Sequence, residues 1–180
     1  VTADQRRIAK TANFGIMYGI SAFGLSQRLH IGRAEAKKII EDYFANFPAI
    51  SSYIEDTLTD ARETGYVETI FGRRRYLPDI NSKNGTDRSL AERTAINAPI
   101  QGTSADIIKI AMINVDRRLE AEKLQSRMVL QIHDELVFDA VSEEVVTLQQ
   151  TVKEEMENVI ELSVPLTVEC NYGSNWLEAH

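Results

Sequence analysis

The chain has 180 residues, a formal net charge of −7 and one cysteine, Cys170. This length allows one domain, or two small lobes, with a sizeable core. The lone cysteine excludes an intrachain disulfide and favours a reducing compartment; with only three scattered histidines, it also argues against a structural zinc site. No apolar run is long enough to span a bilayer and no charged-then-apolar leader is evident, so no membrane partner is expected.

The charge is distributed unevenly along the chain. Residues 1–93 hold 14 Lys and Arg against 12 Asp and Glu, a net charge of +2, whereas residues 94–180 hold 6 against 15, a net charge of −9. We therefore expect phosphate contacts in the first part, and metal ligands or solvated surface in the second.

The first stretch predicted to be helical covers residues 5–19. Thr2 and Gln5 have the spacing of a capping box, and Gly19 suits the end of the helix. Side chains four residues apart share a helix face, so one stripe carries two cations and then two aromatic rings: Arg6, Lys10, Phe14 and Tyr18. This order suits a ligand with a polyphosphate at one end and a flat base at the other. Each pair alone is also common on a solvated or packed helix face.

Three more helices are predicted before residue 65. Ser21 caps a short helix to Leu29 that ends near Gly32, and apolar spacing predicts a second helix over residues 33–46. A third runs from about residue 49 to 64.

Residues 66–71 alternate like a strand and lead into the densest basic cluster of the chain: Arg73, Arg74 and Arg75. The cluster suits phosphate contact, although arginines are also common in exposed turns. Residues 81–87 are rich in turn-forming side chains and predict a flexible loop.

A helix is predicted over residues 88–98, with Asp87 as its N-cap. Arg93, Asn97 and Gln101 follow one another at four-residue spacing. Such polar groups suit the minor-groove acceptors that are similar in every base pair, but they would equally suit a polar face at a helix break.

Pro99 and Gly102 predict a break in this helix. A second helix is predicted to begin at Thr103 or Ser104 and to run to about Glu122.

Residues 127–141 contain two apolar runs that flank His133, Asp134 and Glu135, which predicts a tight hairpin. A hairpin tip is a rigid place for a metal ligand and Mg²⁺ prefers oxygen, but Asp also favours turns for backbone reasons. A helix from Ser142 to about residue 161 and a strand over residues 164–170 are predicted to follow.

Three stretches resemble, in the same order, conserved motifs of the family A DNA polymerases: residues 5–19, 92–112 and 127–141. The resemblance covers almost the whole chain, including its W-x-x-A-H close at residues 176–180. It implies that Arg6 and Lys10 bind a nucleoside triphosphate, that Phe14 packs beside its sugar and base, and that Tyr18 lies at the templating position.

The resemblance also assigns catalytic and DNA-contacting groups. Asp134 and Glu135 would bind two catalytic Mg²⁺ ions, and with Lys10 they form the implied catalytic set. DNA contacts are implied for seven side chains: Arg73, Arg74, Arg75, Arg93, Asn97, Gln101 and His133.

The expected fold is α+β, with a helical fingers lobe over residues 1–70 and the C-terminal part of a palm over residues 71–180. The palm part would hold a long helix, the catalytic hairpin in an antiparallel sheet, a further helix and a terminal strand. The family's motif A, with its second metal-binding Asp, and the thumb do not occur in the chain. We therefore expect a piece of a larger enzyme that is inactive alone.

The implied activity is template-directed transfer of nucleotides from deoxynucleoside triphosphates to a primer 3′-OH, in DNA replication and repair. Expected partners are primer–template DNA, these triphosphates and the upstream palm and thumb, in the bacterial cytoplasm at the nucleoid. Three alternatives remain: a single-subunit phage-type RNA polymerase, a non-catalytic binding module, and a metal-dependent phosphohydrolase. The last would need more histidine ligands, for which His30 and His180 are poorly placed.

Overall fold

The computed structural model describes residues 1–179, so His180 lies outside the described residues. The chain forms two compact units, Val1–Thr103 and Ser104–His180, and the boundary falls inside helix α5, Gly85–Glu122. The fold is α+β as expected, with helices and two small antiparallel sheets. The unit boundary differs from the expected division near residue 70, because the first hairpin and the start of α5 share a core with the preceding helix.

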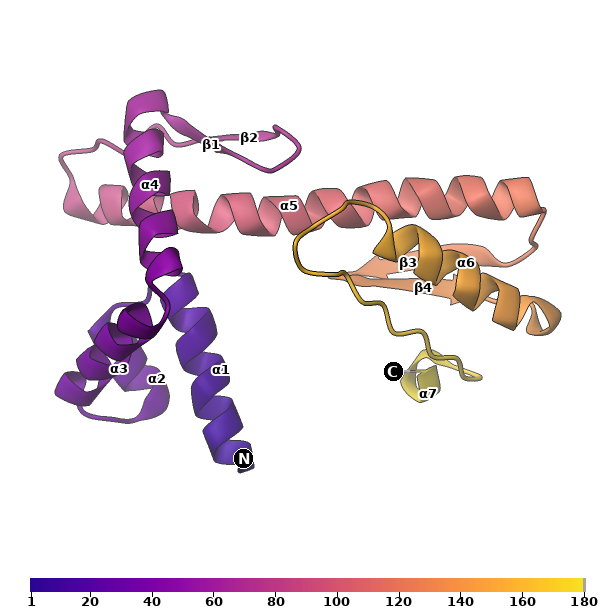
Figure 1. Cartoon of the computed structure of the whole chain (residues 1–180), viewed down its shortest axis with the longest axis horizontal. Coiled ribbons are helices and arrows are strands. Elements are labelled where there is room, and N and C mark those ends of the chain that lie inside the picture. Colours follow the sequence, from indigo (N-terminus) through magenta and orange to yellow (C-terminus); the bar gives the residue numbers. More distant parts are fainter. Residues whose placement is uncertain (180) are drawn as a thin grey trace. The chain divides into compact units, whose positions relative to one another are not determined.

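The first unit opens with the four predicted helices (Figure 1): α1 Ala3–Met17, α2 Ala22–Leu29, α3 Arg33–Asn46 and α4 Pro48–Thr64. Local signals explain where they begin. The capping box of α1 is present, with Gln5 N donating to Thr2 Oγ1 at 3.2 Å and Thr2 N donating to Gln5 Oε1 at 2.9 Å. Helix α2 ends at Leu29 as predicted, but its C-cap is His30, in the left-handed conformation (φ 56°), and not Gly32.

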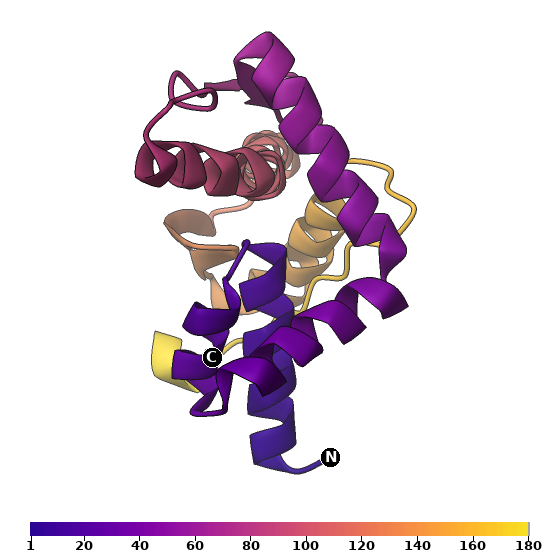
Figure 2. The same cartoon turned by 90° about the vertical axis from the view of Figure 1, so that its left-hand side faces the viewer.

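Helices α3 and α4 meet end to end at an angle (Figure 2). Phe47 is at once the C-cap of α3 and the N-cap of α4, and Pro48 opens α4, where its missing N–H costs no helical bond. One turn earlier, the Tyr43 hydroxyl donates to Asn13 Oδ1 at 2.8 Å, and the Tyr43 and Phe47 ring centroids are 5.1 Å apart. This junction is therefore tied to α1.

Strands β1, Tyr66–Glu68, and β2, Arg74–Tyr76, form an antiparallel hairpin. Strand β1 is shorter than predicted because the chain turns at Gly72 (φ 79°), where Thr69 N donates to Arg73 O at 3.0 Å. The hairpin, α4 and the first half of α5 share an apolar core: Ala61, Val67, Leu77, Ile80, Ala91 and Ala95.

The β1–β2 turn is docked on α5. Ile70 N donates to Thr103 Oγ1 at 3.2 Å, and the Thr69 side chain lies so close to Gly102 that a Cβ there would be 2.6 Å from Thr69 Cγ2. Only glycine allows this approach without displacing a buried neighbour.

The predicted break in α5 is wrong. The helix begins at Gly85, two residues before the predicted cap Asp87, and continues through Pro99 and Gly102 to Glu122. Proline removes a single helical donor, and the packed face on its N-terminal side keeps the helix in place. The glycine serves close packing, and Thr103 accepts a hydrogen bond from the hairpin and does not cap a new helix.

The second unit contains the hairpin β3, Arg127–Ile132, and β4, Glu135–Asp139, followed by the short 3₁₀ helix η1, Ser142–Glu144, helix α6, Val145–Glu157, and helix α7, Trp176–Ala179. The hairpin is confirmed, and α6 ends four residues before the predicted residue 161. The second half of α5 and α6 pack through a core of Val115, Leu119, Leu148 and Val152.

The predicted strand over residues 164–170 does not form. Pro165 cannot donate to a ladder, and side chains of α6 take the place of a neighbouring strand. Val168 N donates to Glu157 Oε1 at 2.9 Å, and Gln149 Nε2 donates to Cys170 O at 3.2 Å. The segment is therefore unpaired with any strand in residues 1–179.

Among residues 1–179, no helix combines the length and the apolar character that crossing a membrane requires.

Candidate nucleotide, DNA and metal sites

One face of α1 borders an open hollow of about 580 Å³, which we call the α1 hollow; it is lined by Arg6, Ala9, Lys10, Asn13, Phe14 and Phe47. Three of the four residues in the predicted stripe thus lie together. Arg6 and Lys10 are exposed, and neither side chain forms an ion pair within the described part of the chain. Tyr18 caps α1, with its ring centroid 6.3 Å from that of Phe14.

Phe47 is a residue of the α1 hollow that sequence reasoning missed. Its spacing indicated only an apolar position at the end of a helix, yet its ring is 53% exposed. The only sequence signal was Pro48, which marks the junction where α3 gives way to α4. Two unpaired cations beside two exposed rings can attract a polyanion that carries a flat or apolar end.

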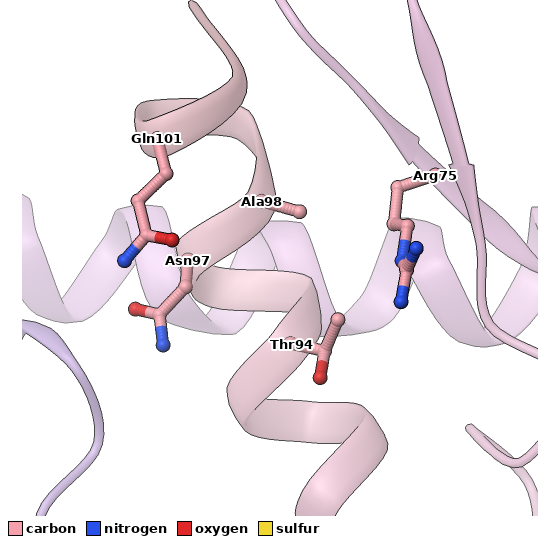
Figure 3. Close-up of a pocket in the computed structure, with 5 residues that line it drawn as sticks. All are labelled: Arg75, Thr94, Asn97, Ala98 and Gln101. Atoms are coloured by element: carbon pink, nitrogen blue, oxygen red, sulfur yellow. The ribbon is translucent and has the colours of Figure 1, made fainter. Parts of the chain in front are cut away.

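A second hollow, of about 290 Å³, lies between β2 and α5 in the first unit. We call it the α5 hollow; its residues are Arg75, Thr94, Asn97, Ala98 and Gln101 (Figure 3). The structure therefore brings together three of the predicted DNA-contacting residues. Thr94 was missed, although it lies three and seven residues before Asn97 and Gln101, which is the spacing of one helix face.

The polar groups of the α5 hollow have spare hydrogen-bonding capacity. The Oδ1 atom of Asn97 is buried and accepts no hydrogen bond within residues 1–179. The Thr94 hydroxyl donates to Leu90 O at 2.9 Å, which leaves its oxygen free to accept. Buried polar atoms usually have a partner, so an unpartnered one beside a hollow points to a polar ligand.

The other predicted DNA contacts in this unit make bonds within the protein. Arg73 donates to Gly102 O at 3.0 Å, and Arg74 Nε donates to Glu68 Oε1 at 2.6 Å. This bond to Glu68 is the main cause that raises the pKa of Arg74 above its ordinary value. Arg93 Nε donates to Ser89 O at 3.3 Å, and its Cγ lies 3.3 Å from where a Cβ on Gly19 would be.

The tip of the β3–β4 hairpin carries the predicted metal ligands. His133 (φ 54°) and Asp134 form the two-residue turn and are exposed, and Glu135 opens β4 and is half-buried. No group of three metal-ligating side chains occurs among residues 1–179. Carboxylate oxygens suit Mg²⁺ in kind, but two adjacent carboxylates are few for two ions.

Comparison with known protein families shows which family this chain belongs to. The profile of DNA polymerase family A matches residues 1–178. The chain belongs to DNA polymerase family A.

Several relatives of this family A chain are named DNA polymerase I. The chain is 54% identical over 179 residues to the protein of Streptococcus pneumoniae, 53% over 179 residues to that of Geobacillus stearothermophilus and 51% over 180 residues to that of Pseudomonas aeruginosa. These matches cover 99–100% of the chain but 20% of each relative. The chain therefore spans about a fifth of the length of the curated relatives it matches.

A solved structure agrees in fold. The POL domain of Pol1 from M. smegmatis, in complex with DNA primer–template and dNTP, matches with a TM-score of 0.97 and 48% sequence identity. The match covers 99% of the family A chain and 32% of that domain's chain.

The base of the β3–β4 hairpin in this family A chain is closed by a carboxylate. Glu144 accepts hydrogen bonds from the backbone N–H groups of Gln125 and Ser126 at 2.9 Å each and from Ser126 Oγ at 2.7 Å, and Val141 N donates to Ser126 Oγ at 3.0 Å. These donors, with the Gln125 N–H foremost, lower the pKa of Glu144. The two ends of the hairpin are thus held by one charged group.

Proposed function

We propose that this chain is the nucleotide-binding and hairpin-bearing part of a DNA-directed DNA polymerase, which transfers nucleotides from deoxynucleoside triphosphates to a primer 3′-OH on a template. The observation that carries the proposal is the α1 hollow, with two unpaired cations beside an exposed ring, in a chain of DNA polymerase family A. The names of the relatives support the same activity.

The α1 hollow would receive the incoming nucleotide. Arg6 and Lys10 supply fixed positive charge for the triphosphate, and Phe14 supplies an apolar surface for the sugar and base. Lys10 stabilises the negative charge that develops on the departing pyrophosphate, and such preorganised charge is among the largest contributions to catalysis. Tyr18, at the end of α1, would lie beside the templating base.

The hairpin tip would hold Mg²⁺ through Asp134 and Glu135, whose oxygen donors fit this ion in kind. Divalent ions in such sites stabilise the attacking and leaving oxygens of an in-line displacement. Because two adjacent carboxylates are few for two ions, a further carboxylate from outside this chain would complete the ligand set. His133 would contact the primer terminus.

The α5 hollow would face the primer–template. Asn97 and Gln101 carry amide donors and acceptors that suit the minor groove, where all base pairs present similar acceptors. Such contacts test the geometry of a base pair without reading its sequence. Arg93 would contribute from the same helix.

The proposal includes a role in replication and repair of the chromosome, in the cytoplasm at the nucleoid; what supports it is that the relatives are bacterial proteins named DNA polymerase I. The phage-type RNA polymerase alternative has no support from these relatives, and incorporation of ribonucleotides in place of deoxynucleotides would revive it.

Primer extension tests the proposal. We compare extension by the 180-residue chain with extension by the same chain joined to the upstream residues of its full-length protein. Both reactions contain Mg²⁺ and all four deoxynucleotides. We expect template-dependent extension from the full-length protein and none from the chain alone. Extension by the chain alone that disappears in Asp134→Ala would show that its metal site is already complete. No extension by either protein, with primer–template binding retained, would favour the non-catalytic module.

A further inference from the structure

The three consecutive arginines 73–75 do not share one environment. In the β1–β2 pair, Arg74 lies opposite Glu68 and Arg75 lies opposite Val67. Side chains directly opposite each other share a face of a hairpin, and successive side chains alternate between faces. Val67 is buried in the core against α5, so Arg75 points to the α5 side and Arg74 to the other side.

Arg73 and Arg74 are occupied within the protein. The Arg73 guanidinium donates to the carbonyl of Gly102, where the hairpin turn is docked on α5. The Arg74 guanidinium bonds to Glu68 and lies 4.4 Å from the centroid of the Tyr66 ring. Both arginines therefore stabilise the hairpin. Their bonds hold β2 in register with β1 and hold the hairpin turn on α5.

Arg75 has neither kind of partner. Its guanidinium makes no hydrogen bond or ion pair within residues 1–179, and it lies beside Thr94 and Ala98 in the α5 hollow (Figure 3). No carboxylate lines this hollow, so its charge is positive. A planar guanidinium suits a phosphodiester, which it can bind through two parallel hydrogen bonds, and the Thr94 side chain lies on the same side of α5 (Figure 3).

We propose that Arg75, alone of the three arginines, binds a phosphodiester of the primer–template, and that Arg73 and Arg74 position it by fixing the β1–β2 hairpin on α5. The inference rests on the proposed function, since it assumes that the full-length protein binds primer–template DNA. It narrows a cluster of three cations to a single contact beside Asn97 and Gln101.

The salt dependence of DNA binding separates the three arginines. Each phosphate neutralised by a protein contributes about 0.9 to the slope of log K against log salt concentration on duplex DNA. Binding of primer–template by the full-length protein, without Mg²⁺, is measured between about 50 and 200 mM KCl for Arg75→Gln, Arg74→Gln and the unchanged protein. We expect Arg75→Gln to reduce the steepness of the slope by about 0.9. Arg74→Gln should leave the slope unchanged, because Arg73 and the apolar core still hold the hairpin on α5 and so keep the Arg75 contact.

The Tm of the same proteins should show the opposite pattern to the salt slope. Arg74→Gln loses its bonds to Glu68 and should lower Tm, whereas Arg75→Gln should not. Arg75→Lys keeps the charge and should restore the slope. The inference would be overturned if Arg75→Gln left the slope unchanged, or if Arg74→Gln reduced its steepness as much as Arg75→Gln does. Failure of Arg75→Lys to restore the slope would also overturn it. If the unchanged protein does not bind primer–template at all, the proposed function fails instead.

Discussion

The α1 hollow and the tip of the β3–β4 hairpin present opposite charges to solvent. The hollow gathers two cations and a ring from one helix, and its remaining wall comes from Phe47 at the α3–α4 junction. The tip gathers two adjacent carboxylates, and no group of three side chains that could hold a metal ion forms among residues 1–179. A single helix can build most of a phosphate site, because its side chains repeat on one face. A site for two metal ions needs ligands from separate segments.

The largest effect is expected at the hairpin tip. In the full-length protein, Asp134→Asn removes the charge of the proposed metal ligand. Such a ligand contributes several kcal/mol, so extension should fall by at least about 10³-fold. Single-turnover extension over a range of Mg²⁺ concentrations measures it. Asp139→Asn, at the other end of β4, is the matched control and should keep the activity. Equal losses of extension activity in both variants would contradict the proposal that the hairpin tip holds the metal.

The next largest effect concerns the α1 hollow. Lys10→Ala removes a preorganised charge and should lower the single-turnover rate by about 10²–10³-fold, with little change in DNA affinity. The control is Lys37→Ala on α3, an exposed lysine that pairs with Glu41 at 3.4 Å and should leave the rate unchanged. If Lys10→Ala weakened DNA binding and kept the rate, the hollow would be a DNA site and the contrast with the tip would be lost.

A smaller effect is expected from adding one hydroxyl to the hollow. Phe14→Tyr should make the full-length protein accept dideoxynucleotides more readily, by at least about tenfold, because the new hydroxyl replaces a hydrogen bond lost with the 3′-OH. Competition between a deoxynucleotide and its terminator at a single template position measures this preference. Unchanged preference would indicate that α1 is not the nucleotide helix.

The smallest effect concerns how the hairpin is held. Because the folded-state pKa of Glu144 is lowered, its contribution to stability is full above the ordinary value of about 4.3 and is lost as pH falls through the lower folded value. Glu144→Gln should therefore lower Tm at neutral pH by a few degrees, and the two Tm curves should converge in acid. Nucleotide binding at α1 should not change. A Tm difference that is independent of pH would contradict this assignment.

Local signals in the sequence predicted most of the fold. The Thr2–Gln5 capping box and the two-residue turn at Asp134 depend on neighbours a few residues away, so their spacing was sufficient. Pro99 and the segment 164–170 were misjudged because tertiary neighbours decide them: packing carries α5 past a proline, and side chains of α6 hold a segment that has no strand partner.

The different environments of Arg73, Arg74 and Arg75 could not be predicted from the sequence. Three identical side chains in a row carry no sign of which face of a strand each will occupy until the register with β1 is known. The place of Phe47 in the α1 hollow could not be predicted either, because it depends on the angle at which α3 and α4 meet.

The close approach at Gly102 has a consequence for anyone who screens variants of α5. In an ordinary helix interior, glycine is roughly 0.5–1 kcal/mol less favourable than alanine, so a saturation library would be expected to enrich alanine. At position 102 a methyl group would meet buried Thr69 at 2.6 Å, and enrichment should reverse. Depletion of every other residue at this position would thus report a hairpin pressed against a helix backbone, and would be mistaken for a catalytic requirement if only activity were scored.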